Sequence, residues 1–244
     1  MNQFHLITLI VTLIVQQVAS QCGGGRGTGY FAHESQCDRY YICENGQVVN
    51  EGLCDDGLVF NEYGNPSRLK CELPFGIDCS NRPNLQPPKP TGECPRQNGM
   101  FPDPRDCTRF IECGNGEAHV KSCASGLAYN RVNGNCDWPE NTPECPAEAL
   151  LGFTCPPATQ RELQLFGNPR YAHPTDCKML YACIPVTTDP SGPRTPRLLG
   201  CDDGFVFNSE TGACDNPKNV RGCENYYGNT IDANNRYSLV ASSS

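Results

Sequence analysis

Eighteen cysteines are the residues of this sequence with the clearest chemistry, because cysteines can form disulfides or hold a metal. They fall into three groups of six, and five residues separate the second cysteine from the third in every group. Zinc sites typically place two cysteines roughly two to four residues apart, and no pair here is that close. The spacing therefore predicts a disulfide scaffold in an oxidising compartment, with no metal and no cofactor.

The acidic side chains give little support for catalysis. The adjacent acids Asp55-Asp56 and Asp202-Asp203 are matched in the middle group by Ala124-Ser125, so this position does not require a carboxylate. A glycosidase needs two carboxylates on either side of a bond in a sizeable cleft, and modules this small cannot easily enclose one. We therefore predict that the chain is not an enzyme.

Aromatic residues followed by asparagine form a second pattern that could do chemistry. An octet beginning at each fourth cysteine reads CDDGLVFN at 54–61, CASGLAYN at 123–130 and CDDGFVFN at 201–208. An exposed ring can stack on the apolar face of a sugar, and a neighbouring amide can hydrogen-bond its hydroxyl or acetamido groups. The alternative is that the octet rings form a miniature core, and the sequence leaves both possibilities open.

Short hairpins are the elements that must position these residues. Asn45-Gly46 and Asn115-Gly116 follow the third cysteine in their groups and favour type I′ turns between two strands. Each octet begins a second hairpin, which a disulfide between the fourth and fifth cysteines would clamp. Helical periodicity is nearly absent. We expect the rings of Phe31, Phe101 and Tyr171 to lie in the cores of small disulfide-rich all-β modules.

The cysteine groups and the composition between them give the expected organisation. The chain begins with an apolar stretch followed by small residues, as in a secretory signal peptide. Three tandem modules joined by short linkers follow, the first linker being rich in proline. The predicted segments are a signal peptide (1–20), repeat 1 (21–81), a linker (82–90), repeat 2 (91–147), repeat 3 (152–225) and a disordered tail (226–244).

Charge and hydropathy restrict the partners. The net charge is −8, which is the wrong sign for binding the phosphates of nucleic acid. No segment reaches the roughly 20 apolar residues that a membrane-spanning helix needs. We therefore predict a secreted protein that binds neither nucleic acid nor membrane.

Together, the fixed five-residue gap, the octet, and a proline three residues after each fifth cysteine resemble the peritrophin-A, or type-2 chitin-binding, domain. Three such units after a signal peptide are similar to the obstructor family of three-domain cuticular proteins. The resemblance implies that the first cysteine pairs with the third, the second with the sixth and the fourth with the fifth. The implied disulfides are Cys22-Cys43, Cys37-Cys79, Cys54-Cys71, Cys94-Cys113, Cys107-Cys145, Cys123-Cys136, Cys155-Cys183, Cys177-Cys223 and Cys201-Cys214.

The resemblance also implies a sugar-binding surface on the hairpin between the fourth and fifth cysteines. On this sequence the implied residues are Phe60, Asn61, Tyr129, Asn130, Phe207 and Asn208. Trp138, Tyr41 and Tyr181 are further candidates, because they add flat rings near the hairpins.

The expected function is multivalent binding of chitin in arthropod cuticle or a similar extracellular matrix, with other cuticle matrix proteins as further candidate partners. A gut peritrophic-matrix protein is an alternative, although such proteins often carry mucin-like tracts that are absent here. The sequence is also compatible with a binding-only isoform of a chitin-modifying enzyme, and with a signalling or inhibitor ligand built on a cysteine scaffold.

Overall fold

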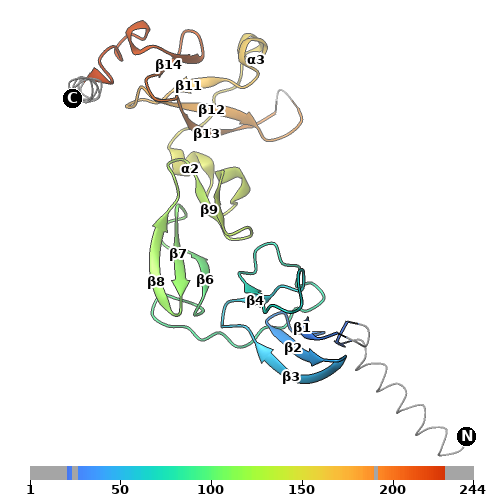
Figure 1. Ribbon diagram of the computed structural model, residues 1–244. Coiled ribbons are helices and arrows are strands. Elements are labelled where there is room, and N and C mark those ends of the chain that lie inside the picture. Colours follow the sequence, from blue (N-terminus) through green and yellow to red (C-terminus); the bar gives the residue numbers. More distant parts are fainter. Residues whose placement is uncertain (1–20, 24–26, 190–191, 229–244) are drawn as a thin grey trace, which may run out of the picture. The chain divides into compact units, whose positions relative to one another are not determined.

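The computed structural model describes residues 21–23, 27–189 and 192–228 (Figure 1). The predicted signal peptide and residues 229–244 of the predicted tail lie outside this range. The chain divides into two compact units. The first contains repeat 1, the linker and most of repeat 2, namely the residues up to 122 together with 129–135. The second contains 123–128 and the chain from 136 onward, and so includes repeat 3.

Each repeat contains a three-stranded antiparallel sheet followed by a two-stranded hairpin. The three strands of each sheet follow chain order, as Figure 1 shows for β6, β7 and β8. The sheet strands are β1 (Gly29–Ala32), β2 (Arg39–Glu44) and β3 (Gln47–Leu53); β6 (Gly99–Pro102), β7 (Arg109–Gly114) and β8 (Glu117–Ser122); and β11 (Arg170–Ala172), β12 (Met179–Pro185) and β13 (Arg194–Gly200). The second hairpins consist of β4 (Val59–Phe60) and β5 (Cys71–Glu72), β9 (Ala128–Asn130) and β10 (Asn135–Asp137), and β14 (Val206–Asn208) and β15 (Ala213–Asp215).

The predicted type I′ turns connect the longer strands of repeats 1 and 2. Both central residues have positive φ, 50° and 80° at Asn45-Gly46 and 50° and 81° at Asn115-Gly116. Asparagine and glycine tolerate this conformation at the lowest cost, and its twist matches that of the strands. The turn dipeptides therefore set the registers Glu44↔Gln47 and Gly114↔Glu117.

Disulfides and a few rings make up the small cores. Cys22 and Cys43 pack with Tyr41 and Phe31 in one cluster of repeat 1. Phe101 packs in the same way against a cluster of repeat 2, which confirms the core prediction for both phenylalanines. Tyr171 is half-buried, and its ring lies 5.6 Å from that of Phe153.

Eight of the implied disulfide pairs are present in the structure, and Cys107 and Cys145 are disulfide-bonded as well. No cysteine among the described residues is free.

Two short α-helices depart from the expectation that helices would be nearly absent. They are α2 (Ala147–Leu151), between repeats 2 and 3, and α3 (Gln160–Phe166), inside repeat 3. Thr159 and Glu162 form a capping box that satisfies backbone N–H groups at the start of α3. The Thr-x-x-Glu spacing is the sequence signal that could have indicated α3. Two single-turn 3₁₀ helices, η1 (Pro139–Asn141) and η2 (Pro217–Asn219), follow the second hairpins of repeats 2 and 3.

Two segments predicted to lie outside the modules are packed against them. In the linker, Gln86 is buried, and its backbone N–H donates to Asp38 Oδ2 at 2.7 Å. The expected disorder is also wrong at the start of the tail. The hydroxyls of Tyr226 and Tyr227 donate to Asp176 Oδ1 and to the Phe205 carbonyl, at 2.5 and 2.9 Å. Repeat 3 therefore extends at least to residue 227.

Candidate functional site

The octet rings lie inside the modules, which favours the core interpretation of the two that the sequence left open. Phe60, Tyr129 and Phe207 are only 2%, 6% and 3% exposed. Phe60 packs against Tyr40, and Tyr129 stacks on Phe110 with centroids 4.9 Å apart. Modules this small have few other large apolar side chains with which to fill a core. Protein atoms therefore cover the rings that the resemblance had assigned to sugar.

The octet asparagines shape the loops of the second hairpins. Asn61 Oδ1 accepts the backbone N–H of the residue two positions later at 2.9 Å. Asn130 and Asn208 accept the equivalent bonds at 2.9 and 3.0 Å. This Asx-turn replaces a backbone turn and fixes the course of the loop. The Asn61 amide also donates to Glu72 Oε2 at 2.7 Å, across the hairpin.

Tyr41 and Tyr181 are also buried, at 4% and 5% exposure. The Tyr41 hydroxyl donates to the Glu34 carboxylate. Burial, and then this hydrogen bond, raise the pKa of Tyr41 well above its ordinary value. Tyr181 stacks on Phe153 with ring centroids 4.3 Å apart. Both rings therefore belong to the packed interior, and neither is available to a polysaccharide without rearrangement.

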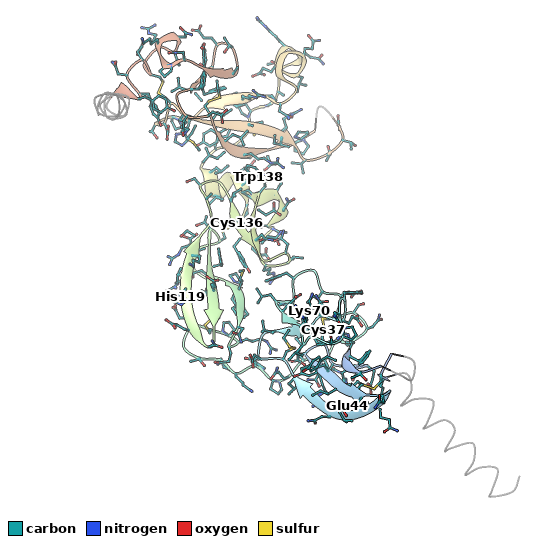
Figure 2. All side chains as sticks on the ribbon, in the orientation of Figure 1. Cys37, Glu44, Lys70, His119, Cys136 and Trp138 are labelled. Atoms are coloured by element: carbon teal, nitrogen blue, oxygen red, sulfur yellow. A yellow bond between two sulfur atoms is a disulfide. The ribbon has the colours of Figure 1, made fainter. Side chains whose placement is uncertain are left out.

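Trp138 lies where repeat 2 meets repeat 3, within the second unit (Figure 2). The Arg197 guanidinium of β13 lies over the indole ring, 4.8 Å from the ring centroid. Arg197 also forms an ion pair with Glu140, in η1. One face of the indole is therefore covered by the next repeat, and Trp138 joins two modules.

We expect Arg197→Gln to expose Trp138, because it removes both the cation over the ring and the ion pair with Glu140. A cation–π contact of this kind is worth about 0.5–2 kcal/mol. Trp138 is the single tryptophan, so its emission should move to longer wavelength and acrylamide should quench it more strongly. Arg170→Gln is the control: the Arg170 guanidinium donates to the Gly212 carbonyl and not to the indole region, so this variant should leave the spectrum unchanged. Identical spectra for both variants would show that Arg197 does not cover the indole.

The residues exposed on the second hairpins are the ones that the sequence pattern did not indicate. Tyr63 is 65% exposed and Val132 is 81% exposed. Both stand two residues after an octet asparagine, and the Asx-turn holds their backbone N–H groups. In repeat 3, Glu210 occupies the same position. The position two residues after each octet asparagine can be found by aligning the octets, but only the structure shows that its side chains project into solvent.

The hairpin loop of repeat 1 is held by local hydrogen bonds. The Asn61 N–H donates to the Lys70 carbonyl at 2.9 Å, and Asn65 Oδ1 accepts both the N–H and the hydroxyl of Ser67. Tyr63 thus offers an exposed ring on a loop that local hydrogen bonds hold in place. Such a surface can stack on a sugar ring and hydrogen-bond its hydroxyls in water.

Metal-binding and membrane-spanning roles receive no support from the described residues. Within residues 21–23, 27–189 and 192–228, no group of three or more His, Cys, Asp or Glu side chains could hold a metal ion. No helix in the described part of the chain is long and apolar enough to cross a membrane.

Three disulfide-clamped modules in tandem, each with a three-stranded sheet and a second hairpin, define a small disulfide-rich all-β repeat protein. A model of the chitin-binding Peritrophin-A domain matches residues 22–79, 94–145 and 166–223. The chain belongs to the family of proteins built from this domain. The third match begins where α3 ends, so α3 and the Cys155-Cys183 disulfide extend repeat 3 in the N-terminal direction.

Individual relatives agree with this assignment. Protein obstructor-E of Drosophila melanogaster is 37% identical over 206 residues, which cover 80% of this chain and 79% of that protein. Peritrophin-1 of Anopheles gambiae is 33% identical over 118 residues, covering 45% of this chain and 74% of that protein. Peritrophin-44 of Lucilia cuprina is 24% identical over 188 residues, covering 76% and 44%.

Proposed function

We propose that the chain is a secreted, non-enzymatic protein that binds chitin at several points and organises or protects a cuticular matrix. The observation that carries this proposal is that all three repeats match the chitin-binding Peritrophin-A domain. The similarity to obstructor-E over most of both chains supports the three-repeat arrangement. Chitin is itself a repeating polymer, so tandem modules can engage one chain or several at once.

The exposed loops of the second hairpins are the proposed contact surface, with Tyr63 as its aromatic residue in repeat 1. One stacked ring and a few exposed hydrogen bonds are each worth about 1 kcal/mol. A single module should therefore bind only in roughly the micromolar to millimolar range. Linked modules can exceed that affinity by about 10² to 10⁴ when they engage together. Strong binding of the polymer thus depends on multivalency.

Two rival functions follow from the relatives. The first rival is a protein of a peritrophic matrix, as the names Peritrophin-1 and Peritrophin-44 suggest. The second is a binding-only isoform of a chitin-modifying enzyme, because a segment of 52 residues is 40% identical to a protein named Endochitinase of Brugia malayi. A cuticular location is favoured because mucin-like tracts are absent from the sequence. Antibody staining of cuticle and gut separates the two locations, and staining confined to the gut would contradict the proposed role.

Co-sedimentation with insoluble chitin tests the proposed activity. We expect the oxidised protein to sediment with chitin, while much less sediments with cellulose, which lacks the acetamido group. EDTA should leave binding unchanged, because the proposed surface uses no metal. Equal sedimentation with both polymers would show that acetamido groups are not recognised, and no sedimentation with chitin would overturn the proposal.

Tyr63→Ala should weaken binding of a short chitin oligosaccharide to repeat 1 by about fivefold, the equivalent of about 1 kcal/mol for one stacked ring. Tyr63→Phe keeps the ring and should bind almost like wild type. Leu69→Ala, which also truncates an exposed side chain of this hairpin, provides the control. Chemical-shift titration measures each affinity on a folded protein. If Tyr63→Ala and Leu69→Ala have the same effect, the ring does not contact sugar.

A further inference from the structure

The junction between repeats 1 and 2 contains a buried carboxylate whose hydrogen-bond donors lie outside its own repeat. The Asp56 side chain is fully buried and receives three hydrogen bonds from the linker and repeat 2. Arg96 Nη1 donates to Oδ1 at 2.6 Å, and the backbone N–H groups of Lys89 and Gln97 donate to Oδ2 at 2.9 and 3.0 Å. The Asp56 carbonyl accepts two more bonds, from the backbone and the side chain of Asn98, at 2.9 and 3.1 Å.

These bonds also determine the charge state of the carboxyl group. Burial raises the pKa of Asp56, but the hydrogen bonds from Lys89, Gln97 and Arg96 outweigh it and hold the pKa below its usual range. The group is therefore an ionised carboxylate at neutral pH, and charge-assisted hydrogen bonds of this kind are roughly twice as strong as neutral ones.

A second buried carboxylate fastens the middle of the linker. Asp38 Oδ2 accepts the N–H of Gln86, and the Gln86 side chain donates to the Cys54 carbonyl at 2.8 Å. Arg96 Nη1 also donates to the Gln86 carbonyl at 3.2 Å. The linker is thus attached to repeat 1 at residues 86 and 89, and little free chain remains before repeat 2 begins.

Close packing supports the same junction. A Cβ atom added at Gly57 would lie 1.8 Å from the Asn98 carbonyl oxygen, so the octet glycine touches the backbone of repeat 2. The ring of Phe75 lies against Gly134, where an added Cβ would be 2.4 Å from it. Gly134 is in the turn of the second hairpin of repeat 2, whose loop carries the exposed Val132. Repeat 1 therefore contacts the hairpin through which repeat 2 is proposed to bind.

The remaining repeats show that the octet by itself does not require this arrangement. Repeat 2 has Ser125 at the octet position that Asp56 occupies in repeat 1. Repeat 3 has Asp203, whose side chain is 97% exposed and forms an ion pair with Lys178 of its own repeat. A Cβ atom added at Gly204, the counterpart of Gly57, would meet nothing within 4 Å. Burial of the octet acid is therefore a property of the first junction.

We propose that repeats 1 and 2 form one rigid binding body and that Asp56 is the positioning residue that fixes their two hairpin loops relative to each other. The inference rests on the proposed function, because it describes how the chitin-binding loops are held. With a flexible linker, each joint engagement would cost chain entropy. A fixed junction removes that cost for chitin surfaces whose spacing matches the two loops, and so adds specificity for the polymer.

Gly57→Ala and Gly204→Ala are a matched pair for the test. Both glycines have positive φ, +97° and +88°, so alanine imposes a similar backbone strain at each. Only Gly57→Ala also inserts a methyl group against repeat 2. Residual dipolar couplings of the full chain report the relative orientation of the repeats without any chitin. One alignment tensor should describe repeats 1 and 2 in the wild type and in Gly204→Ala, whereas Gly57→Ala should need two different tensors.

Affinity for crystalline chitin is the second measurement. Gly57→Ala should lose about tenfold through reduced joint engagement, whereas Gly204→Ala should lose less than about twofold. Affinity of the single repeats for a short oligosaccharide should be the same in both variants. Asp56→Asn, with Asp203→Asn as its control, provides a second pair in case Gly57→Ala fails to fold.

Separate tensors for repeats 1 and 2 in the wild type would overturn the rigid junction, whatever the protein binds. Equal losses of polymer affinity within each pair would overturn the positioning role of Asp56. A single tensor in a wild-type protein that does not bind chitin would instead contradict the proposed function and leave the junction in place, so the two failures are distinguishable.

Discussion

Complete reduction and alkylation should unfold all three repeats and abolish chitin binding. All 18 cysteines are disulfide-bonded, and the clusters at the centre of the modules contain half-cystines beside one to three aromatic rings. Removing one native disulfide from a small secreted domain typically costs about 2–5 kcal/mol, and each repeat would lose three. Because a domain of this size has only about 5 kcal/mol of stability or less, no repeat should remain folded.

Amide chemical-shift dispersion and co-sedimentation with chitin measure the two effects on the same sample. The control is protein treated with the alkylating reagent but without reductant, which should keep both properties, since no described cysteine is free. If reduced and alkylated protein kept its affinity for chitin, the disulfide scaffold would not be what presents the binding loops.

Alanine at the octet aromatics should unfold the modules before it can report on sugar binding. Phe60→Ala, Tyr129→Ala and Phe207→Ala each remove a ring that is 6% exposed or less. Truncating a buried aromatic side chain typically costs about 3–5 kcal/mol, which is comparable to the whole stability of a module of this size. The triple variant should therefore lose folded structure in all three repeats, and its loss of binding would be a consequence of unfolding.

Phe205→Ala is the matched control, because Phe205 belongs to the octet of repeat 3 but is 46% exposed. It should change the melting temperature little, while Phe207→Ala, two residues later, should remove the cooperative transition of repeat 3. Thermal unfolding followed by amide resonances assigned to each repeat separates the two. A triple variant that remained folded and no longer bound chitin would restore the octet rings as sugar contacts.

The cysteine spacing and the turn dipeptides were sufficient to predict the module. The five-residue gap recurs because the scaffold is the same in each repeat, and Asn-Gly at 45–46 and 115–116 fixes a strand connection through its own positive φ values. These are local properties of the chain, and so is the Thr-x-x-Glu cap of α3, which the same reasoning could have used. The resemblance to a known family supplied the disulfide pairing, because spacing by itself leaves many connectivities open.

Only the tertiary structure decided which aromatic rings are buried, which are exposed, and where the modules contact each other. Phe60 and Tyr63 are three residues apart in one hairpin, yet Phe60 is buried against Tyr40 while Tyr63 projects into solvent. Asp56 and Asp203 stand in nearly identical octets, yet Asp56 is buried by the linker and repeat 2 while Asp203 is exposed. The physical reason is that burial depends on residues distant in sequence, such as Arg96 and Gln97, that fold onto the same surface. Composition and spacing therefore determine the scaffold, whereas tertiary contacts within and between the modules determine which of its repeated residues remain exposed.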